Sequence, residues 1–596
     1  MRKVKWIFFG YMGLICLVIA GIALSFSKTA PRDPQTLYLT YDVNLKSLDP
    51  AICNDVIGGD IVGNVYECLY NYEYGVKPYK LYPQLAARMP EVSANGLTYT
   101  VELRRGVHFY DPGKGAFPDG QGPEVKAADF VYSWKRIADF KFASPNYSTL
   151  FQDKVVGLNE WNTYTEEIAE KGGTADYGRP VEGLTALDDY TLQIKLTRPS
   201  PQFRYLMAYL GSAVVSRQAV EHYGDTFNAH PVGTGPYALE DYRPDQRIVF
   251  RKNPTYRGRP DVDGLARLPE AQRLPKVERL HYDYYQELIP VWFLFMEGQY
   301  DAAAIPKESY NQAINPDTRE LRPEMEARGI RLAKSPDPSI FYLGANMKDP
   351  VVGNNKPLRQ AMSMAFDREK YIRIYLNGRG IPANGPIPPG FRTYDPDLAN
   401  PYTQYDVAGA RQKMVEAERI NGGPIPALTL LMGSTDTDTR QLAEFFVSQM
   451  KQIGVEIKVE YSTWARFQEM VDARETQLFS LGWTPDYPDE QTFLQLFYGK
   501  FAPAGGVNSC AYVNPEYDAL YEKARVMVEG PERDALYRKM AAMVREDCPW
   551  TCTYYPLLYR LRHDWLAKYD YMDYGTGMMQ FRVLDVEKRQ KELGKK

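Results

Sequence analysis

Histidine is scarce in this sequence, with five copies among 596 residues, and cysteine is rare, with six. So few histidines leave little room for a histidine-rich metal site or for histidine-based catalysis. Neither sign of charge is in clear excess, because 71 basic residues stand against 75 acidic ones and the formal net charge is −4. Since no basic stripe runs along the chain either, a nucleic-acid partner is not expected.

Motifs of nucleotide binding and hydrolysis are also missing. The sequence contains no Gly-x-x-x-x-Gly-Lys-Ser/Thr loop, no Gly-x-Gly-x-x-Gly fingerprint, no Gly-x-Ser-x-Gly elbow and no His-Glu-x-x-His helix. Gly233-Thr-Gly235 predicts a tight turn, but Pro236 lacks the N–H that a phosphate cradle needs. We therefore expect no cofactor, no metal and no enzymatic activity, although the paired carboxylates of a glycoside hydrolase stay open among so many acidic residues.

The composition that remains is typical of a folded protein, with 44% hydrophobic, 13% aromatic and 24% charged residues. The length indicates about three or four domains. Tyrosine is abundant, with 46 copies. Such an excess of an amphipathic side chain is typical of recognition surfaces, or else it fills strands.

The N-terminus carries the signal for export. Arg2, Lys3 and Lys5 precede an uncharged run over residues 6–26, which is about 31 Å long as a helix and so matches one bilayer core. The basic flank should stay in the cytoplasm, so the rest of the chain is exported. The run is longer than a signal-peptide core. This favours an uncleaved anchor within residues 1–30 over a signal peptide cleaved near residues 23–25.

Export permits disulfide bonds between the cysteines of the exported part. These are Cys53, Cys68, Cys510, Cys548 and Cys552. An odd number leaves at least one thiol unpaired in a monomer. The sequence leaves two readings open, which are a small loop closed between Cys548 and Cys552 and a set of buried free thiols.

Alternating strands and helices are predicted along the exported chain. Residues 97–103 and 190–196 alternate between apolar and polar side chains, as strands do. Residues 237–240 and 247–250 flank a turn and predict a hairpin. Loops or insertions are predicted at residues 111–123, 171–180 and 257–275.

One helix is followed directly by a strand. Its apolar stripe, which we predict to be core, consists of Leu442, Phe445, Phe446, Met450 and Ile453. Gly454 should end the helix, and residues 455–459 then alternate as a strand. This succession is typical of an α/β fold.

Five groups of short stretches follow one another along the exported chain. They are 48–51 (LDPA) with 65–70 (VYECLY); 83–86 (PQLA) with 97–109 and 128–136; 231–237 (PVGTGPY) with 251–256 (RKNPTY); 358–368; and 482–489 (GWTPDYPD). In this order they resemble the family 5 extracellular solute-binding proteins, which are the oligopeptide- and dipeptide-binding receptors of ABC importers. The loops at 111–123 and 171–180 are longer than this family usually carries.

The resemblance implies an α/β fold of the periplasmic-binding-protein-like class II, with two lobes and an extra inserted domain. The expected boundaries are 36–75 with 184–280 and 553–596 for a discontinuous lobe, 76–183 for the inserted domain, and 281–552 for the other lobe. Crossings near 280 and 552 would form the hinge of a Venus flytrap that encloses its ligand.

The resemblance also implies where a peptide is held. In the family, an Asp three residues after the Trp of the last stretch pairs with the amino terminus of the ligand, and that position is Asp486 here. Its alternative role is that of a turn residue between two prolines. We expect Gly482, Trp483 and Thr484 to offer main-chain groups, with Trp483 as a pocket wall or as core. Further candidates at the cleft edge are Tyr147, Asp55 and Asn54.

The implied function is that of an extracytoplasmic substrate-binding subunit. It would capture oligopeptides or dipeptides and deliver them to an ABC permease and its ATPase. We expect a monomer on the periplasmic or extracytoplasmic face of the cell membrane, tethered through residues 6–26. The alternatives are a non-transporting sensor of peptide signals, the same fold with a sugar, opine or nickel chelate as ligand, and an exported hydrolase.

Overall fold

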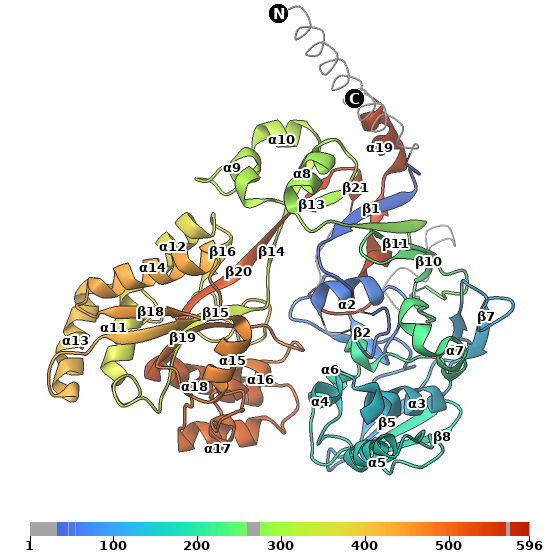
Figure 1. Cartoon of the computed structure of the whole chain (residues 1–596), viewed down its shortest axis with the longest axis horizontal. Helices are drawn as coiled ribbons and strands as arrows, with labels where there is room; N and C mark the ends of the chain where they lie inside the picture. Colours follow the sequence, from blue (N-terminus) through green and yellow to red (C-terminus); the bar gives the residue numbers. More distant parts are fainter. Residues whose placement is uncertain (1–31, 46, 54, 259–273, 568–572, 595–596) are drawn as a thin grey trace, which may run out of the picture.

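The computed structural model describes residues 32–45, 47–53, 55–258, 274–567 and 573–594. Its elements fall into two groups that face one another (Figure 1). We call the group around β1, β5 and β10 the N-terminal half and the group around the eight-stranded sheet the C-terminal half. Helix α19 (Val586–Leu593), near the end of the chain, returns to β1, because Arg589 donates a hydrogen bond of 2.7 Å to the carbonyl oxygen of Thr36.

A four-stranded sheet in the order β1-β12-β11-β10 forms the first layer of the N-terminal half. β1 (Thr36–Tyr41) pairs in parallel with β12 (Arg279–Tyr284), so segments far apart in the sequence lie side by side. β10 (Tyr237–Arg243) and β11 (Arg247–Lys252) form the predicted hairpin, which is confirmed. Asp245 adopts a φ of +55° in its turn, a conformation that Asp tolerates better than most residues.

A second four-stranded sheet lies in the same half, in the order β4-β5-β9-β8. Its strands are β4 (Glu91–Val92), β5 (Thr98–Glu102), β9 (Thr191–Lys195) and β8 (Leu184–Asp188). Both alternating segments predicted from the sequence are therefore strands, and they pair with each other. Helix α3 (Ala127–Ile137) contacts β8 and β9 and places the fully buried Trp134 in this core.

The eight-stranded sheet organises the C-terminal half in the order β13-β20-β15-β19-β17-β18, and β14 and β16 also pair with β20. Its strands are β13 (Ala302–Ala304), β14 (Ile330–Pro336), β15 (Ile340–Ala345), β16 (Gly380–Pro382), β17 (Leu428–Met432), β18 (Ile457–Tyr461), β19 (Leu478–Trp483) and β20 (Trp550–His563). β20 is the longest strand described and runs from the sheet towards the helices α8–α10 (Figure 1).

Helix α14 (Thr437–Lys451) and β18 are the predicted α/β unit, which is confirmed. Asp436 caps the helix by accepting a hydrogen bond from the N–H of Thr439. Beyond its C-terminal end, Gly454 takes a φ of +80°. The predicted stripe lies in or against the core, because Phe445, Phe446, Met450 and Ile453 are buried and Leu442 packs against them.

The remaining helices and strands complete the two halves. They are α2 (Val56–Val62), β2 (Tyr70–Tyr72), β3 (Leu81–Pro83), β6 (His108–Tyr110), β7 (Gln121–Glu124), α4 (Tyr147–Leu150), α5 (Leu158–Glu170), α6 (Phe203–Leu206), α7 (Arg217–Tyr223), α8 (Leu288–Met296), α9 (Tyr310–Ala313), α10 (Pro323–Ala327), α11 (Lys356–Ala365), α12 (Arg368–Tyr375), α13 (Val407–Asn421), α15 (Trp464–Asp472), α16 (Gln491–Leu494), α17 (Pro515–Ala524), α18 (Pro531–Asp547), β21 (Leu566–Ala567) and β22 (Val583–Leu584).

The three predicted loops have different outcomes. The end of 111–123 is a strand instead, since β7 pairs with β6 and the loop between them is anchored by Asp111. Residues 171–180 form an ordered loop on α3, whose Lys135 donates to the carbonyl oxygens of Tyr177 and Arg179. Most of the segment 257–275 lies outside the described residues.

The five cysteines of the described chain are buried free thiols, which decides between the two readings left open by the sequence. Burial raises the pKa of Cys53, Cys510 and Cys552 to about 12. At neutral pH these thiols are therefore protonated and poor nucleophiles.

The helices of the described residues include none that is long and apolar enough to cross a membrane. The proposed anchor at residues 6–26 lies outside the described residues.

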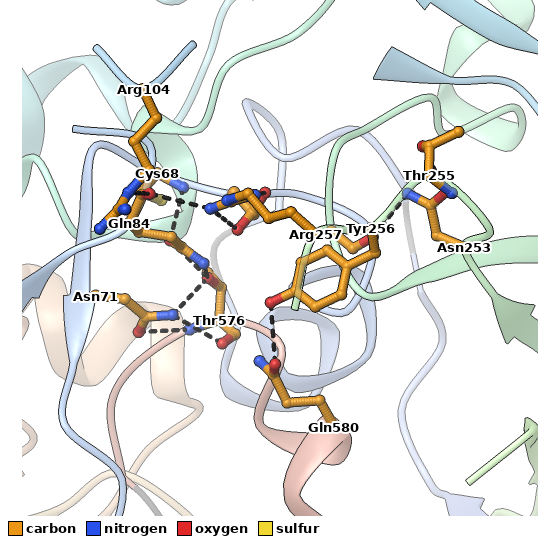
Figure 2. A network of polar contacts seen from close by, with 12 residues as sticks. Cys68, Asn71, Gln84, Arg104, Asn253, Thr255, Tyr256, Arg257, Thr576 and Gln580 are labelled. Atoms are coloured by element: carbon orange, nitrogen blue, oxygen red, sulfur yellow. Dashed lines mark hydrogen bonds and ion pairs between the residues drawn. The ribbon is translucent and has the colours of Figure 1, made fainter. Parts of the chain in front are cut away.

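A buried polar network connects distant segments of the N-terminal half (Figure 2). Arg257 donates two hydrogen bonds to the fully buried carboxylate of Glu67, at 2.7 and 2.9 Å, and a third to the carbonyl oxygen of Gln84. Asn71 exchanges hydrogen bonds with Thr576 from the C-terminal segment. Residues near 70, 84, 257 and 576 are thereby held as one unit.

Removing one partner of this ion pair should destabilise the N-terminal half. The variant Arg257→Met leaves the Glu67 carboxylate buried without its cation, which costs about 3 kcal/mol. We expect a lower urea midpoint by tryptophan fluorescence, and partial recovery in the double variant Glu67→Leu/Arg257→Met.

The control is Lys80→Met, which breaks the exposed pair with Glu73 and should leave the midpoint unchanged. An equal midpoint for Arg257→Met and the wild-type protein would contradict the importance of the buried pair.

Candidate binding cleft

A cavity of about 520 Å³ lies between the two halves. β1 and α2 of the N-terminal half form one wall, through residues such as Leu39 and Ile57. β15 and β20 of the C-terminal half form the facing wall, where Phe341 stacks on Tyr554 at 5.0 Å with nearly parallel rings. Phe341 is 40% exposed and therefore presents an aromatic face to this cavity.

The strand next to the cavity-lining strand β15 has an open edge. β19 pairs with β15 along its whole length, and Phe341 is the register partner of Gly482. On its other side, β17 pairs with β19 only at Leu478 and Phe479. Within the described residues no strand covers that edge beyond Phe479, so the main chain there can accept an added strand.

The predicted residues Gly482, Trp483 and Thr484 lie at the end of this edge. An added Cβ on Gly482 would come within 2.9 Å of the Phe341 ring. Trp483 is partly buried against the core of the C-terminal half and donates a hydrogen bond of 3.2 Å to the hydroxyl of Thr492. The hydroxyl of Thr484 lies 2.9 Å from that of Ser339, which fixes the end of the strand.

Asp486 follows the strand and faces the N-terminal half. Its side chain is accessible to solvent, yet it lies in a recess between the halves, and this burial raises the pKa of its carboxyl group. Lys154 lowers the same pKa by electrostatic attraction across the cleft. No hydrogen bond or ion pair joins the Asp486 carboxylate to another described residue, so it is free to meet a ligand.

Lys154 shares this part of the cleft. Its ammonium group donates to the carbonyl oxygens of Ser148 and Gln152, at 3.0 and 3.4 Å. Burial lowers the pKa of Lys154 to about 8, and neighbouring Arg198 acts in the same direction, whereas Asp153 and Asp486 raise it.

The other predicted candidates have local partners or lie outside the described chain. The hydroxyl of Tyr147 donates to Asn159 at 2.9 Å and does not line the cavity. Asp55 caps α2 by accepting a hydrogen bond from the N–H of Gly58 at 2.7 Å. Asn54 lies outside the described residues. Ligand contacts of all three stay predictions.

Sequence reasoning missed several cavity residues, namely Asp60, Phe341, Arg379, Tyr554 and Arg560. They come from four separate segments, because Tyr554 and Arg560 share β20, and no motif joins them. Their only sequence signal is the high number of aromatic residues, which does not single out positions.

The halves also touch at one side of the cleft. Tyr205 of α6 stacks on Tyr487 with ring centroids 6.0 Å apart and an interplanar angle of 7°. Arg204 and the Tyr205 hydroxyl both contact Glu529, which precedes α18. Arg392 adds a second cation at 3.7 Å from Glu529, on its own half.

Glu529 should hold the two halves together. Glu529→Gln removes the charge that attracts Arg204, so we expect the halves to separate more often and the radius of gyration to rise in small-angle scattering. The control Glu469→Gln breaks an exposed pair with Arg466 within one half and should leave the radius unchanged. An identical scattering curve for Glu529→Gln and wild type would count against this role.

The model of one protein family matches most of this chain. It is described as "Bacterial extracellular solute-binding proteins, family 5 Middle", and it matches residues 80–504, which include the β19 edge and Asp486.

Curated relatives match over nearly their whole length. The chain is 22% identical to the oligopeptide-binding protein OppA of Bacillus subtilis (strain 168), over 88% of this chain and 89% of that protein. It is 24% identical to the glutathione-binding protein GsiB of Salmonella choleraesuis (strain SC-B67), over 86% of each.

Solved structures share the fold. The unliganded open form of the periplasmic murein tripeptide-binding protein MppA superposes with a TM-score of 0.73 at 22% identity, over 93% of this chain and 98% of that one. The periplasmic binding protein DppA from Helicobacter pylori, in complex with the peptide STSA, gives a TM-score of 0.67 at 22% identity, over 92% and 98%. These likenesses confirm the predicted multi-domain α/β fold.

Proposed function

This chain belongs to the family 5 bacterial extracellular solute-binding proteins, and on that premise we propose that it captures short peptides between its halves for an ABC importer. The observation that carries the proposal is the open edge of β19, which pairs with the cavity-lining strand β15. Relatives named for oligopeptides, for glutathione and for a murein tripeptide support a peptide as ligand. The family consists of solute-binding proteins, so we propose binding without chemical conversion.

The peptide main chain would add as a strand beyond Phe479. Strand addition uses the groups that all peptides share, and it therefore tolerates many sequences. Gly482, Trp483 and Thr484 would offer the main-chain donors and acceptors. Pro485 has no N–H, so the added strand should end there.

Asp486 would receive the amino terminus of the peptide. Its carboxylate lies at the end of the open edge and in a recess, where an ammonium group offsets the desolvation of the charge. A charge-assisted hydrogen bond of this kind contributes about 1.5–3 kcal/mol. Lys154 competes with this ammonium group for the Asp486 carboxylate. Its lowered pKa makes it a weaker competitor than a lysine with an ordinary pKa would be.

Ligand binding would close the halves by a hinge motion, as in periplasmic binding proteins. We propose hinge crossings near residues 280 and 552, with lobes of 36–75, 184–280 and 553–596 on one side and 281–552 on the other. The inserted domain of 76–183 would move with the first lobe.

The closed receptor would be recognised by a membrane permease with its ATPase. We propose that the protein acts as a monomer on the extracytoplasmic face and is tethered through residues 6–26. A tether raises the effective concentration of the receptor near its permease.

The test is the affinity of an Asp486→Ala variant for tripeptides, measured by calorimetry. We expect binding of trialanine to weaken at least tenfold, because the ammonium group loses its only proposed anionic partner. Asp119→Ala is the control, since Asp119 is exposed on the 111–123 loop and does not line the cavity. Unchanged thermal unfolding would show that both variants fold. Equal affinity in the variant and the wild type would refute the assignment of Asp486.

A further inference from the structure

The acidic and the basic residues that line the interlobe cavity lie on opposite walls. Asp42 and Asp60 lie on the side of the N-terminal half, after β1 and on α2. Arg379 and Arg560 lie on the side of the C-terminal half, before β16 and on β20. Between them the walls are apolar and aromatic, with Phe341 stacked on Tyr554. A ligand that spans the cavity thus meets an acidic wall and a basic wall.

The carboxylate of Asp60, on α2, has no hydrogen-bond or ion-pair partner among the described residues. Asp55, on the same helix, accepts the capping hydrogen bond from Gly58. Nearby Asp49 forms a buried ion pair with Arg136 at 2.5 Å. By contrast, no hydrogen bond or ion pair within 4.0 Å joins the Asp60 carboxylate to any described residue, and its side chain is exposed to the cavity.

The surroundings of Asp60 disfavour an isolated charge. The residue lines the cavity, and desolvation there raises the pKa of its carboxyl group to about 6. Arg560 and Arg582 lower the pKa, and Asp573 and Asp55 raise it. The basic residues therefore compensate the burial only in part, and a cation supplied from outside would offset the rest.

We propose that Asp60 binds a cationic side chain of the bound peptide, so that the cleft prefers short peptides with a lysine or arginine. The basic wall of Arg379 and Arg560 would face the carboxylate end of the same ligand. This inference rests on the proposed function, and it concerns a second cation, distinct from the amino terminus assigned to Asp486.

Two observations separate this site from that of Asp486. Asp486 does not line the cavity, and its opposing cation is Lys154, whereas Asp60 faces Arg560 and Arg582. The cavity of about 520 Å³ falls within the size range of small-molecule sites, so it has room for a few residues of a peptide.

The test compares matched tripeptides by calorimetry at pH 7.5. The probes are Ala-Lys-Ala and Ala-Ala-Lys, with Ala-Gln-Ala and Ala-Ala-Gln as neutral counterparts. We expect the wild-type protein to bind the better lysine peptide about tenfold more tightly than its glutamine counterpart, which is the effect of one charge-assisted hydrogen bond. Asp60→Asn should reduce this ratio to about one, and Asp60→Glu should retain most of it.

The controls separate a lost interaction from a lost fold. Asp119→Asn, on the exposed 111–123 loop, should keep the wild-type ratio. Binding of the neutral peptides should be similar in Asp60→Asn and in the wild type, because they do not use the charge of Asp60.

The preference should also depend on pH. The cation binds the ionised carboxylate, so affinity for the lysine peptides should rise between pH 5 and pH 7.5, as Asp60 loses its proton near pH 6. The ratio to the glutamine peptides corrects for effects of the other charged groups at the cleft, which are Asp42, Asp55, Arg379, Arg560, Asp573 and Arg582. In Asp60→Asn the ratio should be flat with pH.

Failure of this inference differs from failure of the proposed function. If the wild type binds none of the tripeptides, the peptide-binding function itself is refuted. Suppose instead that the wild type binds the tripeptides and that Asp486→Ala lowers its affinity for them. If the lysine-to-glutamine ratio is then the same in wild type and Asp60→Asn, the function stands and the role of Asp60 is overturned.

Discussion

Main-chain pairing along β20 is the constraint on which the cleft depends. Over 14 residues this one strand pairs with β15 and β16 near its start and with β14 and β13 towards its end. Tyr554, Leu557 and Arg560 of the same strand line the cavity. The shape of that wall is therefore set by backbone hydrogen bonds, and side chains can vary for specificity without loss of the frame.

Several carboxylates inside the halves form buried ion pairs, whereas two carboxylates at the cleft do not. Glu67 with Arg257, Asp49 with Arg136 and Asp489 with Arg533 form buried ion pairs, each within one half. Because each charge in these pairs is already neutralised by its partner, it is not available to a ligand, and the pairs stabilise each half. Asp60 and Asp486 lack such partners and lie where the halves face one another. Because an uncompensated carboxylate in a confined space is unfavourable, the cationic ligand groups proposed above would stabilise the assembly most at these two points.

The sequence predicted what depends on local patterns. The hairpin of β10 and β11 follows from alternation around a turn, and α14 with Gly454 and β18 follows from a change of period at a glycine. The short motifs, taken in order, predicted the fold. The cavity could not be predicted in this way, because Asp60 and Arg560 approach only through the pairing of β1 with β12 and the course of β20. Whether the cysteines form disulfide bonds likewise depends on their distances in three dimensions, which the sequence does not show.

The contacts between the halves bear on how tightly a ligand can be held. If the halves close on a ligand as proposed, the ligand binds with its full affinity only to the closed form, and its apparent affinity falls by the fraction of time that the protein spends open. Tyr205 on Tyr487 and Arg204 with Glu529 join the halves without occupying the cavity. Under the proposed mechanism these contacts would favour closure independently of the ligand, so that a small peptide making few side-chain contacts would still be retained. Specificity can then be left to a few charges, and Asp60 is placed to supply one of them.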